Sequence, residues 1–594
     1  METISLIDTG GFTPEQQDYL ADFFTGVARQ MPRGFAGLTA AGALTCDAAG
    51  GAASLAEPAE QMVHGTPLSE VCREERWKAE EHPLDIWDKL VAHAADNRVP
   101  APDDLFRFKF HGLFYVAPAQ DSFMLRLRIA GGRLTAHQMR GIADVAEAWG
   151  AGRADLTTRA NMQIREFQPK DIVRVLTKIQ SLGLCSRGTG ADNIRNITAS
   201  PATGLDPTEL LDVGSLAEGL HYTILNSRDM YDLPRKFNVA FDSGGSISVL
   251  ADTNDIGFQA VRVLAGRAVA PGVYFRVLLC GITGHKQFAA DAGLLVKPEQ
   301  AVAVAAAMIR VFSEFGDRTN RKKARLKYLV DRWGVEKFIA ETEKRLAFTL
   351  LRCPADQCEP RNPIDRAGHV GVHPQRQPGL NYIGVAVPVG RLPVPQMRAV
   401  AAIADELGSG ELRLTAWQNL LIPNIHSARV AEAVERLRAG GLDCTAGPVM
   451  RGTVACTGNR GCRYAATDTK AHAVEIANML DSRFAIHQPI NLHVTGCPHS
   501  CAQHYIGDIG LLGTKVAGEE GYQIVMGGGA DNDQSLAREI ISAIRYTDLV
   551  PALERLFHAY IAQRGPGESF LQFTRRHSVS ELQDFLATKE AMAS

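Results

Sequence analysis

The sequence predicts an α+β fold with a duplicated, pseudo-two-fold architecture, made of two half-domains and two larger mixed α/β domains. The main observation is an internal repeat, because Gly132–Arg140 (GRLTAHQMR) returns as Gly390–Arg398 (GRLPVPQMR) 258 residues later. Further identical pairs keep this offset along the chain, which chance matches do not do. Each copy also shows a strand, helix, strand, helix order, which is typical of an α+β sandwich unit.

Hydrophobic periodicity predicts the elements of the first copy. An extended apolar stretch, Phe123–Ile129, is followed by a helix that has Met139 and three further apolar residues on one face. Alternation predicts one strand over Leu156–Phe167. A second helix over Asp171–Leu182 ends at Gly183, a residue type that commonly terminates helices.

The repeat and the shifts in composition divide the chain into six predicted segments. They are an N-terminal wrap at 1–104 with a flexible Ala/Gly-rich insertion at 34–65, a first half-domain at 105–189, a first larger domain at 190–345, a connector at 346–373, a second half-domain at 374–445 and a second larger domain at 446–594. The two larger domains are entered through similar junctions, so the duplication extends to them.

Composition excludes several classes of protein. Apolar residues make up 45% and charged residues 22%, ordinary values for a soluble globular chain. The formal net charge of −3 argues against a nucleic-acid coat or a polybasic membrane surface. No apolar run reaches bilayer length, and the N-terminus lacks a signal-peptide pattern. Eleven cysteines, a sparse and odd number, indicate a reducing compartment, so we expect a cytoplasmic protein without nucleic-acid or membrane partners.

Four cysteines are clustered near the C-terminal end. Five residues separate Cys456 from Cys462, and three separate Cys497 from Cys501, a spacing at which a helical turn would point both sulfurs the same way. Four thiolates from two loops are what a cubane iron–sulfur cluster needs. The alternatives are structural zinc, which usually takes cysteines two to four residues apart, and a core of free cysteines. The first half of the repeat has Ser200 where the second has Cys456, so the framework does not require sulfur there.

The other cysteines have no such pattern. Cys353 and Cys358 form a second near pair, but they lie on an Arg- and Pro-rich connector without further partners, so we interpret them as structural. The remaining five are isolated in the sequence: Cys46, Cys72, Cys185, Cys280 and Cys444.

Cationic and amide side chains gather on the predicted strand faces. Alternation places Arg126 with Arg128 on one face, and Lys236 with Asn238 on another. A longer set shares one face of the strand predicted at 156–167: Thr157, Arg159, Asn161, Gln163 and Arg165. One such strand alone would be interpreted as a solvated outer face. Three of them in one half, together with Arg195, favour a buried site for a polyanion.

The cysteine spacings, the repeat and the basic strands together resemble the assimilatory nitrite/sulfite reductase family, whose members carry siroheme and a 4Fe-4S cluster. The resemblance extends from about residue 105 onward. It implies two ferredoxin-like half-domains and two larger domains that bind siroheme and the cluster. It further implies that Cys456, Cys462, Cys497 and Cys501 hold the cluster, and that Cys501 also bridges to the siroheme iron.

The resemblance also implies which residues meet the siroheme and the substrate. Those implied to line the siroheme are Thr157, Arg159, Asn161, Gln163, Arg165 and Gln418, and Gly527–Gly529 resembles a glycine-rich stretch where backbone approaches the cofactor. Those implied to face the substrate are Arg126, Arg195, Lys236 and Asn238. Plant-type nitrite reductases carry Lys then Asn at the last two positions, as here, whereas sulfite reductases carry Lys twice. One fewer positive charge suits monoanionic nitrite, because a buried unpaired cation is costly.

The implied reaction is therefore the six-electron reduction of nitrite to ammonia by a monomeric enzyme. No nicotinamide or flavin domain is predicted, so the electrons come from a partner, by resemblance a ferredoxin. Small ferredoxins are acidic, and Arg321–Lys327 is a candidate docking patch, with a solvated helix face as the alternative. Three other functions stay open: sulfite reduction with the same cofactors, oxidation of a corrin precursor by a related branch of the fold, and a non-catalytic iron–sulfur electron-transfer module.

Overall fold

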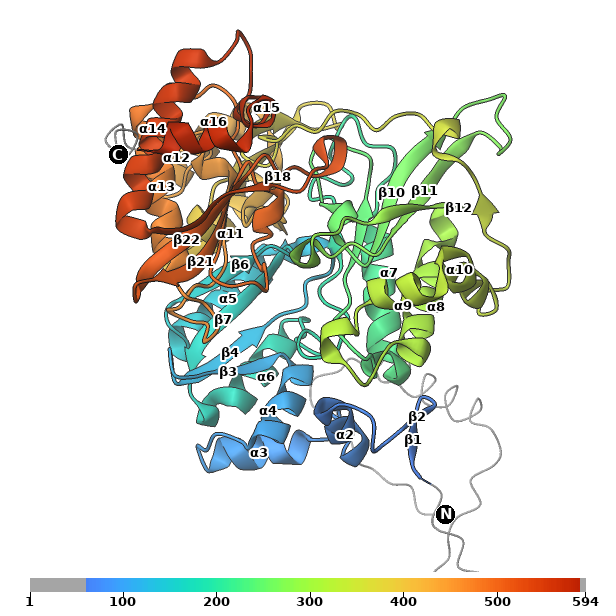
Figure 1. The fold of residues 1–594 in the computed structure, drawn as a ribbon. Helices are drawn as coiled ribbons and strands as arrows, with labels where there is room; N and C mark the ends of the chain where they lie inside the picture. Colours follow the sequence, from blue (N-terminus) through green and yellow to red (C-terminus); the bar gives the residue numbers. More distant parts are fainter. Residues whose placement is uncertain (1–59, 588–594) are drawn as a thin grey trace, which may run out of the picture. The chain divides into compact units, whose positions relative to one another are not determined.

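The computed structural model describes residues 60–587 (Figure 1). The predicted flexible insertion at 34–65 therefore lies almost wholly outside the described residues. Between residues 60 and 587, four sheets of five or six strands are packed with helices, which confirms the α+β prediction. No helix in this range is long and apolar enough to cross a membrane.

The first copy of the repeat forms an antiparallel sheet with two helices. Its elements are β3 (Leu113–Val116), β4 (Ser122–Arg126), β6 (Arg153–Thr157), β7 (Asn161–Phe167), α5 (Ala136–Ala148) and α6 (Ile172–Ser181). The repeated motif explains where α5 begins, because Thr135 and Gln138 exchange side-chain to backbone hydrogen bonds at 3.0 and 3.1 Å. This capping box satisfies two N–H groups that the start of a helix otherwise leaves unpaired.

The prediction of one strand over Leu156–Phe167 is wrong. The segment is a hairpin, in which β6 ends at Thr157, residues 158–160 turn the chain, and β7 begins at Asn161. Ala160 adopts a left-handed conformation (φ 45°), which closes the reversal. Thr157 and Asn161 are directly paired across the hairpin, so they share a face as predicted, but Arg159 projects from the tip instead.

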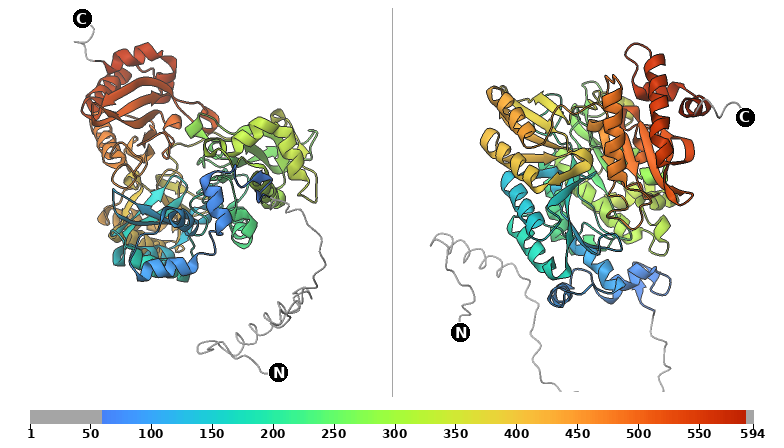
Figure 2. Two further views of the ribbon diagram at one scale, coloured as in Figure 1. Left: turned by 60° about the horizontal axis from the view of Figure 1, so that its bottom comes forward. Right: turned by 90° about the vertical axis from the view of Figure 1, so that its left-hand side faces the viewer.

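The second copy repeats these elements, and the two copies exchange strands. Its elements are β14 (Gly371–Pro374), β15 (Leu380–Val385), β17 (Glu411–Leu414), β18 (Leu420–His426), α11 (Val394–Leu407) and α12 (Val430–Ala439). The short strand β5 (Arg133–Thr135) of the first copy completes the second sheet beside β17, and β16 (Arg391–Pro393) of the second copy completes the first sheet beside β6. One apolar core runs through both copies, which lie side by side in Figure 2 (cyan and orange).

The ion pairs between the two copies are symmetric as well. Arg140 on α5 pairs with Asp405 on α11 at 2.5 Å, and the equivalent Arg398 on α11 pairs with Glu147 on α5 at 2.5 Å. A patch that contacts its own repeat in this reciprocal way is the signature of a two-fold interface. We keep the six-segment division as a proposal, in which the two half-domains share edge strands.

The two larger domains also have matching sheets. The first contains β8 (Thr198–Ala199), β9 (Val239–Asp242), β10 (Ile256–Val263), β11 (Gly272–Leu279), β12 (Ala290–Val296) and β13 (Leu351–Arg352); the second contains β19 (Thr453–Ala455), β20 (Leu492–Thr495), β21 (Ile509–Val516), β22 (Glu519–Met526) and β23 (Arg538–Arg545). In each sheet the first three strands are parallel and the later ones antiparallel. The two larger domains therefore share one sheet topology, as the predicted duplication requires.

Helices cover both of these sheets with apolar faces. Those of the first larger domain are α7 (Gly214–Asn226), α8 (Ala301–Phe315), α9 (Leu326–Trp333) and α10 (Val335–Glu343); those of the second are α13 (Thr469–Arg483), α14 (Tyr546–Gln563), α15 (Phe570–Arg576) and α16 (Val579–Leu586). Each set encloses a separate core. The described part of the N-terminal wrap contains β1 (Met62–Val63), β2 (Thr66–Pro67), α2 (Arg73–Glu80), α3 (Trp87–Ala95) and α4 (Pro102–Phe108).

Candidate functional site

The four clustered cysteines come from two loops at one sheet edge. Cys456 directly follows β19, and Cys497 lies two residues after β20. Because β19 and β20 are neighbouring parallel strands, their carboxyl ends meet at the same edge, where α/β sheets place their ligand sites. The backbone N–H of Gly496 donates to Cys456 Sγ at 3.2 Å, so the two loops are in direct contact.

The segment from Cys497 to Cys501 is not the helical turn that its spacing predicts. It consists of tight turns, with Ser500 in a left-handed conformation (φ 53°). Ser500 and His504 hydrogen-bond each other at 3.0 Å, which fixes the strained backbone beside Cys501. This strained backbone lies in a candidate ligand loop. A fixed position of the Cys501 thiol would offset the free-energy cost of the strain.

The four thiols influence one another electrostatically. Burial, followed by the charges of the other three thiols, raises the pKa of Cys497 to about 11, and the pKa of Cys501 is also raised, mainly by burial. Yet among residues 60–587 no three Cys, His, Asp or Glu side chains converge closely enough to hold a single metal ion. Four thiols on two adjoining loops are the donor type and number that a cubane iron–sulfur cluster takes. The donor set therefore fits the implied cluster.

Cys501 faces a group of cations. Lys236 and Arg126 both act to lower the pKa of its thiol, which places their charges near it. The tip of the β6–β7 hairpin also reaches this point, because the Thr158 hydroxyl donates to the Cys501 carbonyl at 3.1 Å. The structure thus brings a half-domain, a larger domain and the cysteine loops together at Cys501.

Three of the four candidate substrate residues are cations, and none of the three forms an ion pair with a carboxylate within residues 60–587. Arg126 donates to the Thr189 carbonyl at 3.2 Å, and Arg195 donates to the Ala191 carbonyl at 2.9 Å. Burial lowers the pKa of Arg126 to about 10 and that of Arg195 well below its usual value. Burial and the neighbouring Arg325 lower the pKa of Lys236 to about 7. Cations held in this way are stabilised by an anion, which fits both nitrite and the carboxylates of siroheme.

Two of the residues implied to line the siroheme also make hydrogen bonds that join parts of the chain, and their contact with siroheme stays a prediction. Arg159 donates to the Asn196 carbonyl at 2.8 Å and to Asn254 Oδ1 at 2.8 Å, so its guanidinium joins the hairpin tip to the first larger domain. Gln418 accepts from the Ala455 N–H at 2.9 Å and donates back to the Ala455 carbonyl at 3.0 Å. Gln418 therefore holds the strand that ends at Cys456.

The remaining implied residues lie along the hairpin. Arg165 pairs with Asp155 at 3.0 Å and donates to Thr457 Oγ1 at 2.9 Å, so it holds the loop between the first two cysteines. Gln163 accepts from Arg165 at 2.6 Å. Asn161 is buried with its Oδ1 atom unpaired, which leaves it open to a donor. Contact of any of these residues, Thr157 included, with siroheme stays a prediction.

The basic run Arg321–Lys327 is only partly exposed: Lys322 and Lys323 face solvent, so docking of a donor there stays a prediction, whereas two of its arginines have partners inside the protein. Arg321 points inward to Asp192, and Arg325 is buried and pairs with Asp255 at 2.6 Å. Asp255 in turn accepts from the backbone N–H of Asn238 at 2.8 Å. Arg325 was missed as a site residue, because a basic run in a sequence does not distinguish an inward guanidinium from an exposed one.

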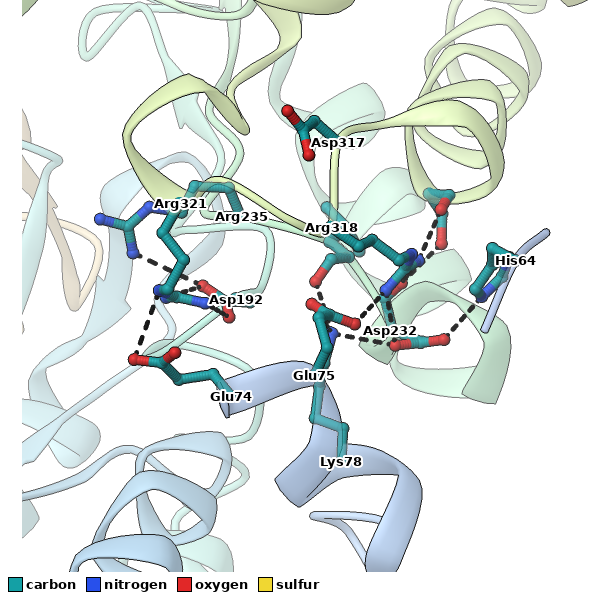
Figure 3. Close-up of polar contacts among 12 residues, drawn as sticks. His64, Glu74, Glu75, Lys78, Asp192, Asp232, Arg235, Asp317, Arg318 and Arg321 are labelled. Atoms are coloured by element: carbon teal, nitrogen blue, oxygen red, sulfur yellow. Dashed lines mark hydrogen bonds and ion pairs between the residues drawn. The ribbon is translucent and has the colours of Figure 1, made fainter. Parts of the chain in front are cut away.

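Asp192 ties together the two loops that carry Arg195 and Lys236 (Figure 3). Its buried carboxylate accepts from both Nη atoms of Arg321 at 2.7 and 2.8 Å, and Arg235 lies 3.6 Å away. Arg235 precedes Lys236 directly, and Asp192 precedes Arg195 by three residues. The network therefore fixes the two candidate anion-binding loops relative to each other.

Neighbouring charges anchor the N-terminal segment to the same region (Figure 3). Glu74 on α2 pairs with Arg321 at 3.4 Å. Glu75 on the same helix pairs with the buried Arg318 at 2.5 Å, and Arg318 also reaches Asp232 at 3.2 Å. The wrap thus contributes charges directly behind the candidate site.

Replacing Asp192 with Asn is expected to cost about 3 kcal/mol of unfolding free energy, because it removes the fully buried negative charge that the half-buried guanidiniums of Arg321 and Arg235 surround. It is also expected to lower kcat/KM about 10- to 100-fold through displacement of the two loops. Urea unfolding and steady-state turnover measure the two effects. Asp229→Asn is the matched control: Asp229 pairs with Arg310 at 2.7 Å on the surface, where less than about 0.5 kcal/mol is expected. Equal losses in both variants would contradict the positioning role.

The glycine run Gly527–Gly529 is required by the packing of the chain itself. A Cβ on Gly528 would lie 2.5 Å from the Tyr505 carbonyl oxygen, and one on Gly529 would lie 2.2 Å from that of Asp533. These short distances leave no room for a side chain at either position, so the packing of the chain alone accounts for the two glycines. The run leads into Asp531, whose backbone N–H donates to Asp252 at 2.9 Å and so joins the two larger domains.

This carboxylate pair predicts a pH dependence of stability. Burial and the charge of Asp252 raise the pKa of Asp531 to about 7, above its unfolded value of about 3.9. The folded state therefore binds this proton more tightly, and its stabilising effect is complete below pH 4 and lost as the pH rises to 7. Urea unfolding between pH 5 and 7 is expected to show this decline, and Asp531→Asn is expected to flatten it. An unchanged slope in the variant would assign the decline to other groups.

Comparison with known proteins identifies the family. The family model described as the nitrite and sulphite reductase 4Fe-4S domain matches residues 190–350 and 446–581, and the model of the ferredoxin-like half domain of the same reductases matches residues 116–182 and 373–440. The chain belongs to the nitrite and sulfite reductase family. The expected family resemblance and the two ferredoxin-like half-domains are thereby confirmed.

Individual relatives agree with this assignment. A ferredoxin–nitrite reductase of Leptolyngbya laminosa is 36% identical over 82% of this chain and 97% of its own length. A chloroplastic ferredoxin–nitrite reductase of Zea mays is 36% identical over 76% of this chain and 81% of its own length. The solved structure of the Mycobacterium tuberculosis NirA protein is 27% identical, with a TM-score of 0.78 over 86% of this chain and 97% of that one.

Proposed function

We propose that the chain is an assimilatory ferredoxin–nitrite reductase, an oxidoreductase that reduces nitrite to ammonia with six electrons. The observation that carries the proposal is that the two cysteine loops adjoin at one sheet edge and that Arg126 and Lys236 lie near Cys501. The relatives with this function cover most of the chain, which supports the same substrate and donor. Siroheme and a 4Fe-4S cluster are the cofactors that this family implies.

Four cysteines would hold the cluster, and the cationic face beyond Cys501 would receive siroheme and substrate. When bound, the two groups supply single electrons to nitrite. Thiolates are the ligands that iron–sulfur clusters require, and Cys456, Cys462, Cys497 and Cys501 are the four that lie together. Thr157 and Asn161, which are directly paired at the base of the hairpin, are proposed to face the siroheme.

The substrate-side residues bind and protonate. Arg126 and Arg195 would donate hydrogen bonds to the nitrite oxygens and stabilise the charge that develops there. Lys236 has a pKa of about 7, so its Nζ holds a proton near neutral pH and can release it to a departing oxygen. Asn238 would orient the substrate through its neutral amide, and its backbone is held by Asp255.

Asn238 is proposed to select nitrite over sulfite, which is the second activity of the family. Asn238→Lys adds one positive charge, so the ratio of kcat/KM for nitrite to that for sulfite is expected to fall at least about tenfold, or 1.4 kcal/mol. Asn238→Gln keeps a neutral amide and is the matched control, with a smaller change in the ratio. Steady-state turnover with both anions measures it. A ratio unchanged by the added charge would remove Asn238 as the selecting residue.

The proposed donor is a ferredoxin, and the proposed setting is a cytoplasmic monomer. Arg460, between the first two cysteines, is 80% exposed at its side chain and pairs with Asp468 at 3.0 Å, so an acidic donor would have to compete with Asp468 for this charge close to the cluster loop. All ten cysteines between residues 60 and 587 are free thiols, as a reducing compartment favours. One chain contributes every residue of the proposed site, so a partner copy is not required.

The visible absorption spectrum of the purified protein tests the proposal most directly. Siroheme bands that change on anaerobic reduction and shift on addition of nitrite are expected, followed by ammonia formation with reduced ferredoxin. Iron–sulfur absorption without siroheme bands, from cells that make siroheme, would instead favour an electron-transfer protein. A colourless protein containing zinc would exclude the reductase.

A further inference from the structure

The near pair Cys353 and Cys358 lies at the start of the connector, against the six-stranded sheet of the first larger domain. The Cys353 N–H donates to the Gly293 carbonyl at 2.8 Å beside β12, and Cys358 forms an isolated bridge with Val263 at the end of β10. Both side chains join one apolar cluster, in which Cys353 is only 2% exposed. The backbone thus holds both cysteines at fixed places on one sheet.

The two thiols are close to each other. Both side chains pack in the same small apolar cluster. One guanidinium contacts both residues, because Arg276 Nη1 donates to the Cys353 carbonyl at 3.4 Å and Nη2 donates to Cys358 Sγ at 3.2 Å. Burial and then the nearby Cys358 raise the pKa of the Cys353 thiol. The turn at 355–357 brings the two ends of this short segment back together. No third metal-binding side chain converges on the pair within residues 60–587, so the pair is not a metal site of the described chain.

A buried guanidinium is aimed at one of the two sulfurs. Arg276 Nη2 donates to Cys358 Sγ at 3.2 Å, and the same group donates to the Pro354 carbonyl at 3.1 Å. Asp291 holds it from the other side at 2.5 Å. These contacts fix a cationic hydrogen-bond donor at Cys358 Sγ, beside the group that would act as the nucleophile in disulfide exchange.

We propose that Cys353 and Cys358 form a reversible disulfide, which makes the start of the connector a site of thiol–disulfide exchange. The half-exposed Cys358 thiolate attacks one sulfur of an external disulfide, a mixed disulfide forms, and one external thiolate leaves. The Cys353 thiolate, formed by loss of its proton to water, then attacks Cys358 Sγ and releases the second external thiolate. The protein loses two hydrogens, and the external disulfide is reduced to two thiols. This assignment replaces the structural interpretation of the pair and does not depend on nitrite.

The sequence around the pair gives a direct test. Trypsin cleavage after Arg352 and Arg361 releases one peptide, residues 353–361, that contains both cysteines. The full-length holoprotein is incubated with oxidised glutathione, blocked with iodoacetamide under denaturing conditions, digested and analysed by mass spectrometry. We expect this peptide to lose two hydrogens and take up no iodoacetamide, and dithiothreitol treatment before blocking to restore two alkylations. A doubly alkylated peptide, or a glutathione adduct that persists at Cys358, would overturn the proposal.

Two variants separate the roles of the residues. Cys353→Ser removes the resolving thiol, so glutathione is expected to remain on Cys358. Arg276→Met removes the donor to Cys358 Sγ, and the rate of disulfide formation is expected to fall about tenfold. Arg310→Met is the control with an unchanged rate, because Arg310 lies on α8 and pairs with Asp229, away from the two cysteines. Equal rates in Arg276→Met and the wild type would remove the activating role of Arg276. The mass of the peptide 353–361 from the wild-type protein shows whether the disulfide forms, even if a variant fails to fold.

Discussion

Replacing Cys501 with Ser is expected to lower nitrite turnover by at least about 10³-fold, or about 4 kcal/mol of activation free energy. A serine hydroxyl does not ionise near neutral pH, so it does not replace a thiolate ligand of iron. Cys501 is also the thiol that faces Lys236 and Arg126, so its loss affects the side of the cluster site nearest the proposed substrate. Iron content, the visible spectrum and turnover with a reduced donor measure the effect.

Cys72→Ser is the matched control for this change. Cys72 occupies the N-cap of α2, where its side chain makes no capping hydrogen bond and serine is a favoured residue. We expect full iron content, unchanged turnover and equal or slightly higher stability. If Cys501→Ser kept both its iron and its turnover, Cys501 would not be a ligand, and the proposed meeting point of cluster and substrate would be wrong.

Replacing Lys236 with Met is expected to lower kcat/KM for nitrite by about 10²- to 10³-fold, because it removes both a charge that stabilises the substrate anion and a proton donor. The folded protein is expected to become no less stable, since Met fills a similar volume and removes a poorly solvated cation. Steady-state kinetics and thermal unfolding of the same preparations measure the two quantities. A loss of activity without a loss of stability is the result that distinguishes a substrate residue from a structural one.

Lys322→Met is the control for Lys236→Met. Lys322 is exposed and belongs to the same larger domain, so its removal changes the net charge equally without touching the proposed site. Unchanged kcat/KM is expected. Comparable losses in the two variants would mean that overall charge, for example through donor docking, governs the rate.

The features predicted correctly from the sequence are those encoded locally or by the repeat. The duplication, the α+β character and the family followed from a constant offset and from cysteine spacings, and each copy's helices followed from periodicity. The hairpin was missed because alternation continues in register on both sides of a three-residue turn, so Thr157 and Asn161 keep one face while Arg159 leaves it. Pattern alone does not indicate where a chain reverses.

The role of a polar side chain was harder to predict than its presence. Arg165 and Gln418 were predicted to line a cofactor, which stays a prediction, but the sequence did not indicate that they also bond to the loop and strand that carry the cysteines. Arg325 was assigned to a surface patch, yet it pairs with Asp255 inside the protein. A hydrogen-bonding side chain takes whichever partner the tertiary fold brings within about 3 Å. The choice of partner is therefore a property of contacts that are distant in sequence.

The exchanged strands β5 and β16 have a consequence for how such a chain could have arisen and for what happens when it is cut. Each half-domain contributes one edge strand to the sheet of the other and receives one in return. This is the arrangement of a domain-swapped homodimer joined into a single polypeptide. Before the gene was duplicated and fused, two identical chains would have closed each other's sheets in the same way. A half-length fragment made today would expose an unpaired edge beside β6 or β17 and would be driven to associate with a second fragment. The covalent connection between the halves therefore converts a concentration-dependent assembly into an intramolecular one. The sequence of each half can then diverge while the other half still completes its sheet.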